Sequence, residues 1–140
     1  MRASFFCFLL SKMLYNPIMV TPVVYQVPSI TKRTHIPQET IRALAEHIAA
    51  QFNPEKIILF GSHAYGIPSA WSDVDFLVIM DAPRGELETA VEISKSLPEL
   101  RFGVDIIVRP KETFEKRIEL GDWFLTEIRE KGKVLYERTD

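Results

Sequence analysis

The chain has 140 residues, of which 46% are hydrophobic and 26% are charged, and its formal net charge is −2. This length and this balance are typical of one globular domain that buries a core of its own. A net charge this small disfavours a generally basic surface, so we expect no direct nucleic-acid partner. The single cysteine, Cys7, excludes an internal disulfide and favours a cytoplasmic location.

Residues 1–35 are interrupted by prolines and show no sustained hydrophobic period. The apolar run at residues 5–10 is much shorter than the roughly 20 apolar residues of a transmembrane helix. No small-residue cleavage site of a signal peptide follows it. We therefore expect an irregular N-terminal arm at 1–35 with a short strand near Val23 to Val27, a folded domain at 36–140, and no association with a membrane.

From residue 37 onward the sequence predicts a regular series of elements. Apolar residues recur at helical spacing from Ile41 to Phe52, and Pro37 suits the first turn of that helix. Asp122 is placed to cap a late helix that Gly132 ends. The expected elements are a helix at 37–53, a strand at 56–60, a loop at 61–72 with one helical turn, a strand at 74–80, a helix at 85–97, a strand at 104–108, helices at 111–120 and 122–131, and a short strand at 134–136.

This order of elements predicts an α/β (α+β) fold in which helices pack on a small mixed central sheet of about three or four strands. The helix at 85–97 connects two strands, which favours a right-handed crossover between parallel neighbours. Parallel neighbours begin on the same side of a sheet. The residues that open these two strands are therefore expected to lie close together.

Acidic residues open both of those strands. Asp73 and Asp75 are one residue apart, so on a strand they share a face. The residues that follow, Phe76 to Met80, are all apolar, which places the two carboxylates at the edge of a core. Asp105 opens the next strand, and neighbouring strands are only about 4.8 Å apart. We expect Asp105 to join the other two carboxylates in one cluster.

Clustered carboxylates repel one another, and a divalent cation removes that repulsion. Mg²⁺ prefers hard oxygen ligands and completes its coordination with phosphates and water. We therefore expect Asp73, Asp75 and Asp105 to be catalytic residues and the ligands of two magnesium ions, with Asp105 also able to accept a proton. Taken singly, each aspartate could instead be a turn, cap or strand-edge residue.

The loop after the first strand is a candidate phosphate-binding segment. Gly61 lets the backbone approach a ligand closely, and a helical turn opened by Ser62 would present free amide groups to an anion. We expect Gly61, Ser62 and Ser72 to bind the phosphates of a triphosphate ligand, although Ser72 could instead support the loop. His63 could reach a phosphate or a second substrate that accepts the transferred group, or could form a hydrogen bond within the loop.

These residues resemble a known family. Gly61-Ser62 after a strand, followed by Asp73-x-Asp75, is similar to the signature of the DNA polymerase β-type nucleotidyltransferase superfamily. The stretches Ile58 to Gly66 and Ser72 to Val78 resemble its small branch, the minimal nucleotidyltransferases, over about residues 37–137. The sequence departs from this pattern at two positions: position 63 holds histidine where relatives often hold arginine, phenylalanine or tyrosine, and position 65 holds tyrosine where they often hold arginine.

The resemblance implies a metal-dependent enzyme that transfers a nucleoside monophosphate, AMP with ATP as substrate, to an acceptor hydroxyl. It also implies a helical HEPN-type partner, whose toxin tyrosine would be the acceptor, and thus an antitoxin role in a homo- or hetero-oligomer. Two alternatives stay open. The chain could neutralise a partner by contact alone, without catalysis, or it could modify a small molecule such as an antibiotic.

Overall fold

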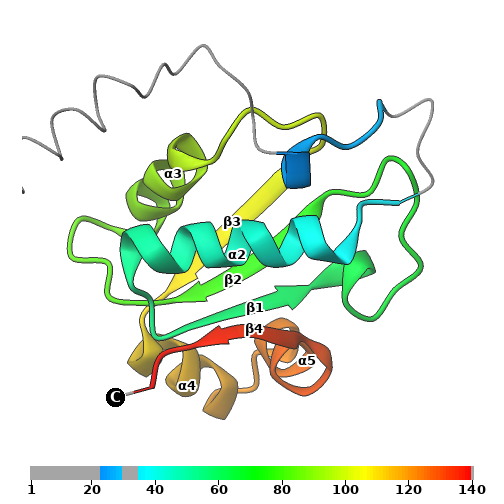
Figure 1. Cartoon of the computed structure of the whole chain (residues 1–140). Helices are drawn as coiled ribbons and strands as arrows, with labels where there is room; N and C mark the ends of the chain where they lie inside the picture. The colour runs from blue at the N-terminus through cyan, green and yellow to red at the C-terminus, as the bar shows by residue number, and fades with distance from the viewer. Residues whose placement is uncertain (1–22, 30–34, 140) are drawn as a thin grey trace, which may run out of the picture.

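The computed structural model describes residues 23–29 and 35–139, which build a sheet with helices on both faces (Figure 1). The sheet is mixed and has the strand order β3-β2-β1-β4. β1 is antiparallel to both β2 and β4, whereas β2 and β3 are parallel. Its strands are β1 (Lys56–Phe60), β2 (Val74–Ile79), β3 (Val104–Arg109) and β4 (Lys133–Glu137). The fold class expected from the sequence is thus confirmed.

Within the described residues, four α-helices form the two outer layers. α2 (Gln38–Phe52) and α3 (Glu86–Ser96) cover one face of the sheet, and α4 (Lys111–Glu119) and α5 (Trp123–Lys131) cover the other. The periodicity of α2 is confirmed because its apolar stripe is fully buried, at Ile41, Leu44, Ala45 and Ile48. The predicted cap of α5 is also confirmed, since the Asp122 carboxylate accepts a hydrogen bond of 3.0 Å from the Leu125 amide.

The central strand β2 separates two apolar cores because its alternate residues face opposite helix layers. Val74, Phe76 and Val78 pack toward α2 and α3. Leu77 and Ile79 pack toward α4 and α5. Asp75 has the same parity as Leu77, so it lies on the α4 and α5 face of the sheet.

The expectation of a strand near Val23 to Val27 is wrong. Residues Val23–Tyr25 form a 3₁₀ turn, η1, that packs on α2. The hydroxyl of Tyr25 donates to the Ala43 carbonyl at 3.0 Å, and Thr40 donates its hydroxyl hydrogen to the carbonyl of Val24. The two bonds run in opposite directions, since Thr40 of α2 donates to the backbone of η1 and Tyr25 of η1 donates to the backbone of α2. The rest of the expected arm lies outside the described residues.

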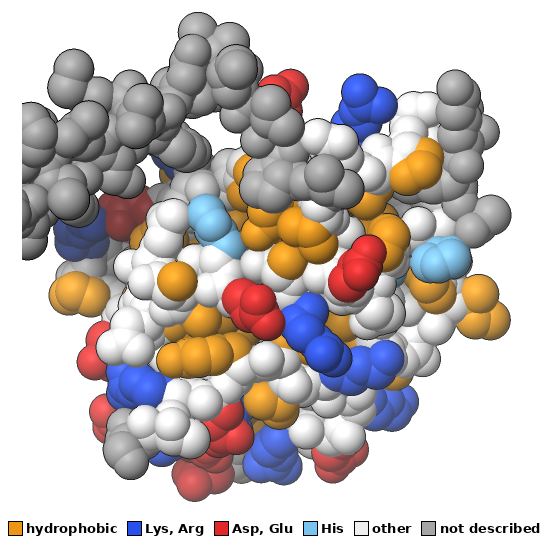
Figure 2. Space-filling model, viewed as in Figure 1, with side chains coloured by type: hydrophobic (Ala, Val, Ile, Leu, Met, Phe, Trp, Pro, Cys, Tyr) orange, Lys and Arg blue, Asp and Glu red, His pale blue; other side chains and the backbone are white. Residues whose placement is uncertain are grey.

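Surface charges on the face that carries α2 are mixed, with acidic and basic side chains interspersed (Figure 2). In the described part of the chain, every helix is too short or too polar to cross a membrane.

Candidate active site

Two of the three predicted carboxylates lie side by side at the beginning of neighbouring strands. Asp75 of β2 and Asp105 of β3 are direct partners in the parallel register. Partners in register point to the same face of a sheet, so both carboxylates stand on the α4 and α5 face. Asp73 lies just before β2 and is exposed. The predicted parallel crossover, and with it the predicted approach of Asp105, is confirmed.

Two glycines make room for this cluster. A Cβ atom at Gly61 would collide with the Asp75 carboxylate, and the backbone there has a φ of +71° that disfavours other residues. A Cβ atom at Gly103 would likewise collide with the Asp73 carboxylate. The carbonyl of Gly103 also accepts a hydrogen bond of 3.0 Å from the Val74 amide, which ties the two strand entrances together.

Sequence reasoning missed Gly103 as a residue of the site. Its position two residues before Asp105 was visible in the sequence. The sequence does not reveal which residue occupies the space that a side chain at Gly103 would fill. That residue is Asp73, which is distant in the chain and comes close to Gly103 only because β2 and β3 pair.

The electrostatics of the cluster are concentrated on Asp75. The pKa of Asp75 is raised from 3.8 to about 6, mainly by partial burial and then by the nearby carboxylates of Asp105 and Asp73. A hydrogen bond between the Asp75 and Asp105 side chains contributes as well. The cluster therefore holds a proton more readily than an isolated carboxyl group does, and a cation in its place would relieve the same repulsion.

The donor set fits magnesium ions that also bind a ligand. Among the described residues, no three acidic, histidine or cysteine side chains are gathered closely enough to hold an ion by themselves. Asp75 and Asp105 nevertheless supply adjacent hard oxygen donors, with Asp73 beside them. Mg²⁺ usually takes one or two protein carboxylates and completes its octahedron with phosphates and water. The residues present fit that type of site better than a closed, all-protein cage.

The candidate phosphate-binding turn begins where β1 ends. Gly61–His63 form the 3₁₀ turn η2, and the amides of Ala64 and Tyr65 donate to the Gly61 carbonyl at 3.0 and 3.1 Å. The predicted helical turn in this loop is thus confirmed. The first amides of such a turn have no partner within it, which leaves them available to an anion. Because Gly61 also touches Asp75, the turn and the carboxylates form one continuous surface.

The remainder of the loop is held by its own polar groups. His63 is only 4% exposed, and its Nε2 donates to the Ser72 carbonyl at 3.2 Å. The hydroxyl of Ser72 accepts a hydrogen bond of 2.9 Å from the Ser69 amide. His63 therefore takes the loop-bracing role, one of the two that its sequence position left open. For Ser72 a contact with nucleotide stays a prediction.

Comparisons with known proteins agree with this arrangement. A family model described as "Nucleotidyltransferase domain" matches residues 41–136, which is more than half of the chain. A protein of Methanocaldococcus jannaschii named "Putative protein adenylyltransferase" is 38% identical over 84 residues, which are 59% of this chain and 78% of that protein. A crystal structure described as "a putative nucleotidyltransferase from Sulfolobus solfataricus" has a TM-score of 0.50 and 21% identity, covering 70% of this chain and 78% of its own. At that identity the solved structure shows a likeness of fold alone.

Proposed function

The chain belongs to the nucleotidyltransferase domain family, and we propose that it transfers AMP from ATP to a hydroxyl group of another protein. The observation that carries this proposal is the register of Asp75 with Asp105, directly beside the turn that Gly61 begins. A protein acceptor is favoured over a small molecule by the name of the Methanocaldococcus jannaschii relative. The proposal of ATP as donor rests on the same name.

The chain's own residues would position both reactants. The backbone amides that follow Gly61, with the hydroxyl of Ser62, would hold the terminal phosphates of ATP. The acceptor oxygen would attack the α-phosphorus and form a new P–O bond. The bond from that phosphorus to the bridging oxygen would break, and pyrophosphate would leave. Asp105, which is exposed, would accept the hydroxyl proton.

Asp73, Asp75 and Asp105 would hold the magnesium ions of this reaction. When bound, these ions would neutralise the triphosphate, lower the pKa of the attacking hydroxyl and stabilise the leaving group. Asp75 would be the central ligand because it interacts with both of the other carboxylates and is the least exposed of the three. Its raised pKa is the expected property of a carboxyl group that awaits a cation.

For the acceptor, we propose a tyrosine of a small helical toxin of the HEPN type, which would make this chain an antitoxin of the cytoplasm. This part of the proposal rests on the resemblance of the loop and strand motifs to minimal nucleotidyltransferases. A tyrosine hydroxyl suits the site chemically, because its ordinary pKa of about 10 is within reach of metal-assisted deprotonation.

The test is transfer of label from α-³²P-ATP to a co-purified helical partner in the presence of Mg²⁺. Asp75→Asn should abolish the transfer, whereas Asp81→Asn, a matched change at an exposed aspartate beyond the other end of β2, should leave it intact. Mass spectrometry should then find the mass of one AMP group on a tyrosine.

Two outcomes would contradict the proposal. Transfer that is equal in the wild type and in Asp75→Asn would show that the cluster is not catalytic. Full neutralisation of the partner in cells by Asp75→Asn, without any label on the partner, would favour the contact-only alternative.

A further inference from the structure

Trp123 is an exposed aromatic side chain that the proposed chemistry leaves unused. It is the first residue of α5, and 76% of its surface is accessible. Its ring therefore lies outside the apolar core. An exposed indole ring offers a large, flat apolar face that a ligand can contact.

A ladder of aromatic rings connects Trp123 to the carboxylate cluster. Phe60, the last residue of β1, is the register partner of Asp75, so the two side chains share the α4 and α5 face. The ring of Phe124 meets Phe60 edge to face at a centroid distance of 5.7 Å. Trp123 in turn meets Phe124 edge to face at 6.2 Å. Trp123 is therefore connected, through the rings of Phe124 and Phe60, to the strand position that pairs with Asp75, one of the proposed catalytic carboxylates.

The corner that carries Trp123 is held firmly. The Asp122 carboxylate caps α5 by accepting from the Leu125 amide, and it pairs with Arg117 at 2.7 Å. The Asp122 amide also donates to the Arg117 carbonyl at 3.0 Å. These bonds join the end of α4 to the start of α5, so the direction in which the Trp123 side chain leaves the helix is fixed before any ligand binds.

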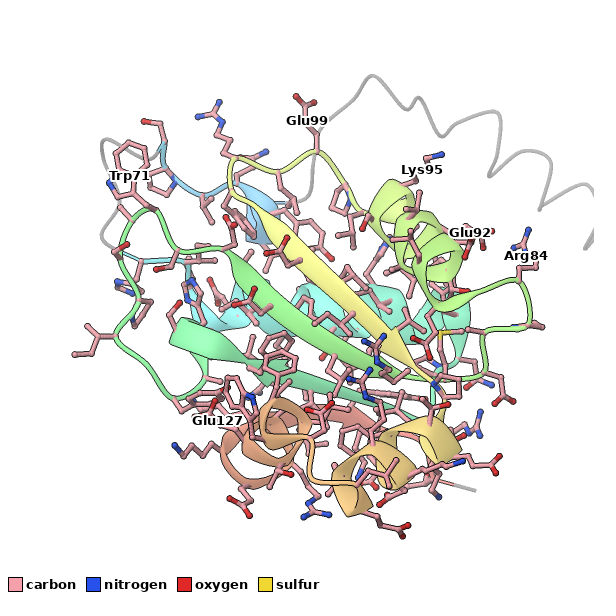
Figure 3. The ribbon with its side chains drawn as sticks, turned by 180° about the vertical axis from the view of Figure 1, so that it is seen from behind. Trp71, Arg84, Glu92, Lys95, Glu99 and Glu127 are labelled. Carbon is pink, nitrogen blue, oxygen red and sulfur yellow. The ribbon has the colours of Figure 1, made fainter. Side chains whose placement is uncertain are left out.

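We propose that Trp123 is the platform on which the base of the nucleotide stacks while its phosphates lie at Gly61 and Asp75. This inference rests on the proposed function, because it assigns the base subsite of the same nucleotide. A braced ring with an open face is the chemistry that binds a purine or pyrimidine, since every base offers a π-face. The other exposed tryptophan, Trp71, stands at the outer end of the loop before β2 and points away from the sheet (Figure 3).

The two tryptophans of the chain allow a direct binding measurement. In a Trp71→Phe background, Trp123 is the single tryptophan, and titration with Mg²⁺ and the non-transferring analogue α,β-methylene-ATP should quench its fluorescence. In a Trp123→Phe background, the same titration should leave the fluorescence of Trp71 unchanged. Inorganic tripolyphosphate with Mg²⁺ should bind to both without quenching Trp123.

Affinities measured by calorimetry separate stacking from folding. Trp123→Ala should raise the Kd of α,β-methylene-ATP by about 5- to 30-fold, the lower part of the range for a base stacked on one ring. Trp123→Phe should restore the affinity to within about threefold of the wild type. The Kd of tripolyphosphate should not change in either variant. Leu120→Ala is the matched control, because Leu120 is 78% exposed at the same corner but is aliphatic, and it should bind like the wild type.

The outcomes distinguish this inference from the proposed function. An unchanged Kd for the analogue in Trp123→Ala, or an equal loss of tripolyphosphate binding, would overturn the platform while leaving transfer activity to be judged by Asp75→Asn. If Trp123→Ala raised only the KM for the protein acceptor, this result would also overturn the platform and would assign Trp123 to partner binding. Quenching and a raised Kd with no transfer to any protein would support the platform and count against protein adenylylation.

Discussion

Replacing Asp75 with asparagine should stabilise the metal-free protein while abolishing transfer. The reason is that the folded state makes ionisation of this carboxyl group costly. Partial burial, together with Asp105 and Asp73, raises its pKa from 3.8 to about 6. A rise of about two pH units corresponds to at most roughly 3 kcal/mol of free energy between the two protonation states. Because the group is partly exposed, solvent screening reduces the expected effect to about 1–2 kcal/mol.

The sign of the pH dependence follows from the direction of the shift. Between about pH 4 and pH 6 the folded chain keeps a proton on Asp75 that the unfolded chain has released. The contribution of this group to the free energy of unfolding is therefore fully present below pH 4 and is lost as the pH rises through 6. Asparagine resembles the protonated carboxyl group and does not titrate. Its advantage should be complete at pH 7.5 and absent near pH 4.

The assay is urea unfolding followed by circular dichroism, in EDTA, at pH 7.5 and pH 4. Asp81→Asn serves as the control for removing one negative charge outside the cluster. Addition of Mg²⁺ with a nucleotide analogue should reverse the order of stability, because only the wild type keeps the full set of ligands. The reasoning is refuted if Asp75→Asn is no more stable than the wild type at pH 7.5, or if its gain is the same at pH 4.

Three further predictions concern the groups that support the site. Gly61→Ala should destabilise the chain by about 1–3 kcal/mol, because alanine disfavours the positive φ and its Cβ atom would collide with Asp75. In a double-mutant cycle, Asp75→Ala should remove part of that cost, and strictly additive effects would contradict the collision. His63→Ala should lower the free energy of unfolding by about 1–3 kcal/mol, because the hydrogen bond to the Ser72 carbonyl is lost and a cavity is left. Limited proteolysis should then cut within residues 64–72, and an unchanged cleavage pattern would argue that His63 does not brace the loop. Asp122→Asn should lower stability at pH 7 because the Leu125 amide, and then Arg117, hold the pKa of Asp122 below its ordinary value. In unfolding curves measured in acid, the difference in stability between the variant and the wild type should shrink as the pH falls through that lowered pKa, and a difference that grows in acid would contradict the prediction.

Local rules were sufficient for the elements and for the candidate carboxylates. The stripe from Ile41 to Ile48 predicts a buried helix face, and the run after Asp75 predicts a buried strand, because each depends on the period of one segment. Asp122 was recognised as a cap for the same reason, since its partner Leu125 is three residues away. The segment at Val23–Tyr25 failed because its conformation depends on α2, whose contacting residues are 16 and 18 positions distant.

The sequence by itself determined which strand residues alternate between the two faces of the sheet, which helices form and which acidic groups open the strands. These properties depend only on neighbours along the chain. Only the tertiary structure decided that Asp75 and Asp105 are partners in register, and that Gly103 leaves space for Asp73. It also decided that the Trp123 ring stays in water while Phe124 reaches Phe60. Such contacts join segments that meet only when the sheet pairs and the helices pack, so no local period encodes them.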